Sequence, residues 1–170
     1  MFGRALIIIE IFAFSIAIGV YADFSHFTWW ALTTFVVSNV LELIDLKKNE
    51  RLEIAAATIC TVVSATVPLL SLIPCTLFNN AFEEYGLFLY TFANWVVHYY
   101  PSLRLLQRVY PLKKQPFSGD AAQITTLYVA IHNPTQIYGC MESQGIYYLL
   151  PVGACVVTVL IELLLNLVKY

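Results

Sequence analysis

The side chains best suited to acid–base chemistry in this sequence are its three histidines, which stand among mostly apolar neighbours. Asn94 and His98 lie four residues apart in the segment FANWVVHYYPSLRLL, so on a helix they would share one face. A histidine with an amide partner can act as a general base near neutral pH. The alternative, which the spacing alone favours, is a packing histidine that is hydrogen-bonded to a neighbouring helix.

A second polar group occurs in the segment AIHNPTQIYGC and consists of His132, Thr135 and Tyr138. His132 and Thr135 are three residues apart, and Pro134 between them removes a backbone N–H, which leaves a carbonyl without its helical partner. A broken helix with clustered polar residues can line a cavity. Alternatively the helix ends early and these side chains meet lipid headgroups. The sequence leaves both interpretations open.

Hydroxyl groups that could act as nucleophiles occur in the segment SHFTWWALTTF, at Thr28, Thr33 and Thr34. Threonine hydroxyls on helices usually bond back to a carbonyl three or four residues earlier, so a single threonine is weak evidence for catalysis. A nucleophilic role would require a base within hydrogen-bonding reach.

The composition predicts that these residues lie inside a membrane. Of the 170 residues 59% are hydrophobic and 12% are charged, whereas soluble domains carry about a quarter charged residues. A net charge of −2 gives no basic surface, so we expect no nucleic-acid partner. Six apolar stretches are each long enough for a span of about 20 residues. They cover residues 5–22, 27–46, 54–78, 85–105, 121–138 and 146–168.

The distribution of lysine and arginine predicts the topology. With six spans, all nine cations fall on one side of the membrane, and the positive-inside rule makes that side cytoplasmic. Five or seven spans would scatter them over both faces. The first stretch resembles a signal peptide, but Glu10 within it favours a retained helix. We therefore expect an all-α, polytopic membrane helix bundle, a single domain over 1–170, with six transmembrane helices and cytoplasmic N and C termini.

Three carboxylates fall within the predicted spans, at Glu10, Glu42 and Glu162. Ionisable groups in a bilayer face protein or a wet cavity. The structural interpretation is that they pair with cations near the cytoplasmic interface, and the functional one is a proton or cation path. The candidate cations are Arg4, Lys47, Lys48, Arg104 and Lys169.

Small residues and cysteines give further structural predictions. Ala56, Cys60 and Ser64 recur every four residues and form a stripe that lets another helix approach closely. The four cysteines contain no C-x-x-C pair, so no metal site is expected. The topology places Cys75 and Cys140 near the outer face, where they could form a disulfide, and places Cys60 and Cys155 within the bilayer as thiols.

The order of these motifs resembles the family of androgen-induced proteins and androgen-dependent TFPI-regulating proteins. Thr28 matches the start of the family's second helix. Asn94, His98 and Pro101 match an Asn-His-x-x-His motif followed by Pro, with Trp95 in place of the first histidine. His132 and Tyr138 approximate its fifth-helix motif, where Asn133 replaces a second histidine.

The resemblance implies a multi-pass membrane enzyme that hydrolyses fatty-acyl esters. It implies Thr28 as nucleophile and His98 as base, with Asn94 orienting the imidazole or stabilising the oxyanion, and no cofactor. His132, Thr135 and Tyr138 would bind the substrate. The expected depths of the residues favour Thr33 as the nucleophile instead, because it is closer in depth to Asn94 and His132, and the sequence leaves the choice open.

Two further hypotheses remain at this point. The chain could be a non-enzymatic accessory subunit of a larger membrane complex, in which its stripe and aromatic residues contact membrane-protein partners. It could also be a small proton or ion transporter that uses the three glutamates. Membrane lipids are partners in every case, and the sequence leaves open whether the membrane is the endoplasmic reticulum, the plasma membrane or that of another organelle.

Overall fold

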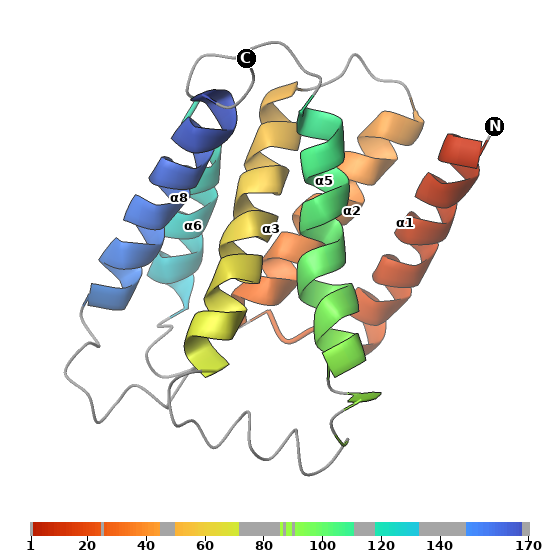
Figure 1. The fold of residues 1–170 in the computed structure, drawn as a ribbon, viewed down its shortest axis with the longest axis horizontal. Coiled ribbons are helices and arrows are strands. Elements are labelled where there is room, and N and C mark those ends of the chain that lie inside the picture. Colours follow the sequence, from red (N-terminus) through yellow and green to blue (C-terminus); the bar gives the residue numbers. More distant parts are fainter. Residues whose placement is uncertain are drawn as a thin grey trace.

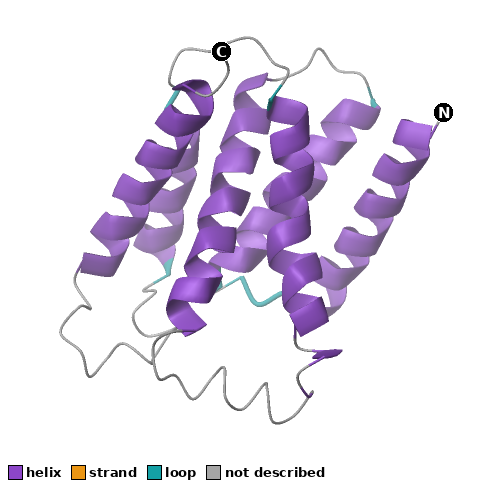
Figure 2. Ribbon diagram, in the orientation of Figure 1, coloured by secondary structure: helices purple, strands orange, loops and turns teal. Residues whose placement is uncertain are grey.

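The computed structural model describes residues 2–24, 26–44, 50–71, 86, 88–89, 91–110, 118–132 and 149–167. Within these ranges every regular element is a helix, so the predicted all-α class is confirmed (Figure 2). The elements are α1 (Phe2–Tyr21), α2 (Phe27–Leu43), α3 (Glu50–Ser71), η1 (Trp95–Tyr99), which continues directly into α5 (Tyr100–Val109), α6 (Asp120–Ile131) and α8 (Leu149–Leu167).

The helices form an antiparallel bundle with both chain ends at the same end of the molecule (Figure 1). The helix α3 is central and packs against α2, α5, α6 and α8. The helix α1 lies at one edge of the bundle against α2, while α6 and α8 pair at the other edge.

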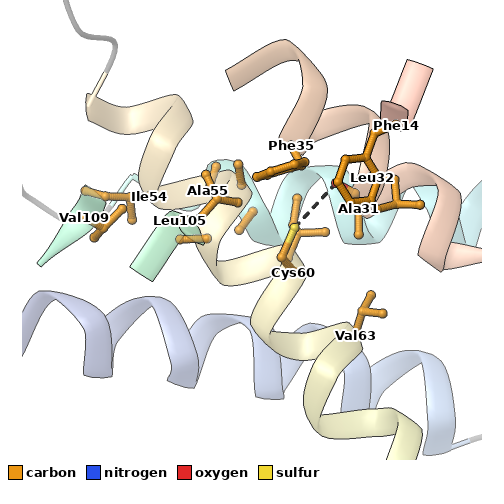
Figure 3. Close-up of a cluster of buried hydrophobic side chains, with 14 residues drawn as sticks. Phe14, Ala31, Leu32, Phe35, Ile54, Ala55, Cys60, Val63, Leu105 and Val109 are labelled. Carbon is orange, nitrogen blue, oxygen red and sulfur yellow. Dashed lines mark hydrogen bonds between the residues drawn. The ribbon is translucent and has the colours of Figure 1, made fainter. Parts of the chain in front are cut away.

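The core is built around the small side chains of α3. Ala56 is completely buried and Cys60 is 2% exposed, and the Sγ of Cys60 lies 3.5 Å from the carbonyl oxygen of Ala31 on α2 (Figure 3). Larger residues of α2, such as Leu32 and Phe35, fill the space beside this contact. The predicted small-residue stripe therefore does bring two helices close together.

Apolar side chains also cover the outside of the bundle. On α1, Ile9, Phe12 and Val20 are 63%, 70% and 65% exposed, and exposed large apolar residues also occur on α2, α5, α6 and α8. Polar residues such as Glu10 and Glu162 are buried instead. Judged by length and composition, one helix in the described part of the chain could cross a membrane, namely residues Gly3–Tyr21.

Several helix bounds differ from the predicted spans. Within the span predicted for 121–138, α6 ends at Ile131 and His132 has extended backbone angles (φ −113°, ψ 125°), and residues 133–138 lie outside the described residues. A proline at position 134 has no N–H to donate to the carbonyl of Ala130, which favours an end of the helix before this position. At the start of α3 the helix begins at Glu50, earlier than predicted, where Glu50 and Glu53 favour the positive end of the helix dipole.

Candidate functional site

His98 lies in a π-helical turn, η1, in which a backbone hydrogen bond joins residues that are five positions apart instead of four. The N–H of Tyr100 donates to the carbonyl of Trp95, five residues earlier. Pro101 follows at the start of α5 and has no N–H to donate to the carbonyl four residues before it. The proline therefore interrupts the α-helical pattern at this point. Single π-turns within α-helices are uncommon and frequently occur at functional sites.

The backbone of His98 is held by α3, while part of its imidazole is left without a partner. The Oγ of Ser64 lies 2.5 Å from the carbonyl oxygen of His98 and 2.8 Å from that of Cys60. The Nδ1 of His98 is shielded from solvent and has no hydrogen-bond partner in the described part of the chain. A shielded imidazole nitrogen of this kind is available to exchange a proton with a substrate group.

The helix register places Thr28 level with His98. Ala31 of α2 faces Cys60 of α3, and Ser64, which contacts His98, lies four residues or about 6 Å further along α3. Because the two helices are antiparallel, the same distance along α2 leads from Ala31 back to Phe27 and Thr28. Thr28 thus matches His98 in depth, although no described contact joins their side chains.

Thr28 and Thr33, the two candidate nucleophiles, lie on different faces of α2. Thr28 precedes Phe35 and Asn39 by seven and eleven residues, so the three share one face. Phe35 packs edge-on against Phe14 of α1 with ring centroids 5.2 Å apart, which directs this face toward α1.

Thr33 shares its face with Val37 and Val40, which are 42% and 37% exposed. Its hydroxyl donates to the carbonyl of Trp29 at 2.8 Å, and the hydroxyl of Thr34 likewise donates to Ala31. The hydroxyls of Thr33 and Thr34 are thus hydrogen-bonded within their own helix.

His132 belongs to an aromatic group on another side of α2. Its ring centroid lies 6.0 Å from Trp30 and 5.5 Å from Tyr128, and Tyr128 also packs against Phe27. No described contact joins His132 to His98. Asn94 is half-buried directly before the π-turn and makes no side-chain capping bond there. Two further predicted site residues, Thr135 and Tyr138, lie outside the described residues.

Glu10 is the centre of a buried polar cluster next to the π-turn. Its Oε1 accepts hydrogen bonds from Arg104 Nε at 2.7 Å and from the hydroxyl of Tyr100 at 2.5 Å, and its Oε2 accepts one from Asn39 at 3.2 Å. Glu10 is only 3% exposed. The predicted pairing of Glu10 with a cation is confirmed, and the cation is Arg104. Sequence reasoning missed Tyr100, although Tyr100 and Arg104 are four residues apart and share one face.

In the described part of the chain, Glu162 accepts hydrogen bonds mainly from backbone groups and is not paired with a predicted cation. Its Oε1 accepts bonds from the N–H and hydroxyl of Ser118 and from the N–H of Gly119, at 3.0–3.2 Å. Gly119 has a left-handed φ of 71°, which a glycine adopts without strain and which lets both amides face one oxygen. Glu162 thereby binds the amino end of α6, where the helix dipole favours a negative charge.

An exposed ion pair lies close to the same helix end. Arg51 of α3 makes two hydrogen bonds to Asp120, at 2.8 and 3.1 Å. These bonds and the negative charge of Asp120 raise the pKa of Arg51 above its ordinary value. The third predicted glutamate, Glu42, is half-buried and lies close enough to Arg108 to interact with its charge.

Cys60 and Cys155 were predicted to be thiols within the bilayer, and their free thiol state is confirmed. Cys60 is buried and Cys155 is half-buried, and both are free. Cys75 and Cys140, the predicted disulfide, lie outside the described residues. In the described part of the chain no three His, Cys, Asp or Glu side chains come together as metal ligands.

The chain was compared with protein-family models, with curated proteins and with solved structures. None of the three comparisons gives a match. The residues around His98 are therefore the basis for assigning a function.

Proposed function

We propose that this chain is a multi-pass membrane protein that hydrolyses fatty-acyl esters, with His98 as the base. The membrane location is supported by the distribution of side chains, which is inverted relative to a soluble protein. Large apolar residues face outward on α1, α2, α6 and α8, while Glu10, Asn39 and Glu162 are buried and hydrogen-bonded. Exposed apolar surface of this extent marks a contact with lipid or with another protein.

The six-span topology is supported by the alternating direction of the helices. The helices α1 and α3 begin, and α5 ends, at the same end of the bundle (Figure 1). Arg4, Arg51 and Arg108 belong to these helix ends, whereas Asp23 follows the opposite end of α1. The positive-inside rule assigns the first end to the cytoplasm.

Cysteine labelling tests this topology. On a background without the four native cysteines, Asp23→Cys and Gln107→Cys should react with a membrane-impermeant maleimide from opposite sides of sealed vesicles. Reaction of both variants from one side would contradict the proposed span number.

The single observation that carries the hydrolase proposal is the shielded Nδ1 of His98, which has no hydrogen-bond partner among the described residues, whereas the hydroxyl of Tyr100 beside it is hydrogen-bonded to Glu10. The proposed nucleophile is Thr28, whose hydroxyl makes no hydrogen bond with the described part of the chain and which lies at the depth of His98. An acyl chain would reach this depth laterally from the bilayer.

The reaction proceeds in two steps. The Thr28 oxygen attacks the ester carbonyl carbon while His98 accepts the hydroxyl proton, and His98 then protonates the leaving alkoxide. Water hydrolyses the resulting threonyl ester, again with His98 as base, which restores the free hydroxyl and releases a fatty acid. The amide of Asn94 would stabilise the oxyanion or orient the imidazole.

Activity measurements on the purified protein test the assignment. His98→Ala should lower the turnover of long-chain acyl esters by at least about 100-fold, the usual contribution of a general base. Comparison of Thr28→Ala with Thr33→Ala identifies the nucleophile. His26→Ala is a matched control, because His26 lies at the outer end of α2 beside Asp23. Wild-type turnover in His98→Ala would refute the proposal, and a stable hetero-complex without esterase activity would favour an accessory subunit.

A further inference from the structure

The hydroxyl of Tyr100 joins the π-turn that carries His98 to the buried carboxylate of Glu10 on α1. From this contact we propose that Glu10 and Tyr100 are positioning residues that set the orientation of the His98 imidazole. The inference rests on the proposed role of His98 as a base, and it assigns a function to a buried carboxylate that the reaction itself does not use.

Tyr100 fixes one end of the π-turn through its backbone and its ring. Its N–H closes the turn on the carbonyl of Trp95, and its ring stacks on Phe14 of α1 with centroids 6.2 Å apart and an angle of 13°. The ring of Trp95 lies 6.1 Å away on the same helix. Tyr100 is therefore held against α1, and Trp95, at the other end of the turn, packs on Tyr100.

Glu10 is itself immobilised by two other helices. Arg104 of α5 and Asn39 of α2 both donate to its carboxylate, so the acceptor for the Tyr100 hydroxyl cannot easily rotate away. In a shielded interior such a charge-assisted hydrogen bond is stronger than in water. From the opposite side, Ser64 of α3 holds the His98 carbonyl. The π-turn is thus anchored at two points by different helices.

These anchors matter because a π-turn is less favourable than an α-helical turn and persists where surrounding contacts require it. Relaxation of the turn to the α-helical pattern would shift the register of His98 relative to α3 by one residue. The Nδ1 would then point in another direction. Loss of the Tyr100 hydroxyl should consequently alter catalysis without removing any reacting group.

The kinetic test uses Tyr100→Phe, which keeps the ring packing and removes only the hydroxyl. We expect kcat to fall by about tenfold to a hundredfold with KM unchanged, as for a slight misplacement of a catalytic group. Tyr99→Phe is the matched control, because the Tyr99 hydroxyl makes no hydrogen bond with the described part of the chain. Glu10→Gln retains an oxygen that can accept from Tyr100 and should keep more activity than Glu10→Leu.

A spectroscopic test separates this inference from the proposed function. The chain contains only three histidines, so the ring signals of His98 can be assigned in NMR spectra of the isotope-labelled protein by comparison with His26→Gln and His132→Gln. Tyr100→Phe should move the His98 ring signals, and Tyr99→Phe should not. Unmoved His98 signals in Tyr100→Phe would overturn the positioning role even if the protein is an esterase. Shifted signals in a protein without esterase activity would overturn only the proposed function.

Discussion

The Nε of Arg104 lies 2.7 Å from the Oε1 of Glu10, and this ion pair joins α5 to α1 across the interior of the bundle. The side chains of Glu10 and Arg104 are 3% and 22% exposed, respectively. The helix α1 otherwise packs mainly against α2. The position of the first helix therefore depends on a polar contact whose two members are 94 residues apart.

Loss of either partner in this ion pair should destabilise the fold more than loss of both. Glu10→Leu or Arg104→Leu should each lower the free energy of unfolding by about 3 kcal/mol, because each leaves an uncompensated charge in a shielded place. The double variant should lose less than the sum of the single losses. Unfolding in mixed detergent micelles measures these values, with the exposed Arg4→Leu as control. Additive losses would show that the two side chains do not stabilise each other.

The close approach of α3 to its neighbours gives a packing prediction. Ala56→Leu should lower the free energy of unfolding by about 1–3 kcal/mol or more, because Ala56 is completely buried and an added side chain must displace its neighbours. Ala65→Leu is the matched control on the same helix, since Ala65 is exposed. The same unfolding measurement compares the two variants. Equal effects of the two substitutions would contradict close packing at Ala56.

The helical class and one internal ion pair could be predicted because both follow from local patterns. Long apolar stretches separated by short polar segments indicate helices, and a glutamate in an apolar helix needs a partner. The pairing of Glu10 with Arg104 was included among the predicted pairs. The small side chains at Ala56 and Cys60 likewise predicted close helix contact from their spacing alone.

The geometry around His98 could not be predicted in the same way. The π-turn changes the helical phase by one residue, and nothing in the spacing of Asn94 and His98 reveals it. The partner of Tyr100 depends on how α1 and α5 rotate about their axes, which is set by packing over the whole bundle. The sequence marks the end of α6 by Pro134 and the polar residues beside it, although the length of the whole segment predicts a span that continues to residue 138.

The contact between Glu162 and the start of α6 predicts a local change when the carboxylate is removed. Glu162→Leu should destabilise the first turn of α6 by about 1–3 kcal/mol, because the amides of Ser118 and Gly119 lose their acceptor. Hydrogen exchange should become faster at those amides and in the first turn of α6. Leu160→Ala, at a 52% exposed position of the same helix, is the control. Unchanged exchange in Glu162→Leu would show that the amides are satisfied in another way.

The contribution of the Arg51–Asp120 ion pair to the free energy of unfolding should decrease in high salt. Titration of Arg51 should not change this contribution near neutral pH. Because the pKa of Arg51 is raised in the folded state, its contribution to stability is present at lower pH and is lost only as pH rises through that raised pKa. Between about pH 6 and about pH 9 the guanidinium of Arg51 is protonated in both the folded and the unfolded protein. The titration of Arg51 therefore does not change the stability difference between wild type and Arg51→Gln in this range. The pair is exposed, so about 1 M salt should reduce that difference. Arg51→Lys keeps the charge but not the two-point contact and should fall between the other two proteins. A difference that persists unchanged in high salt would indicate that Arg51 stabilises the helix ends by packing rather than by charge.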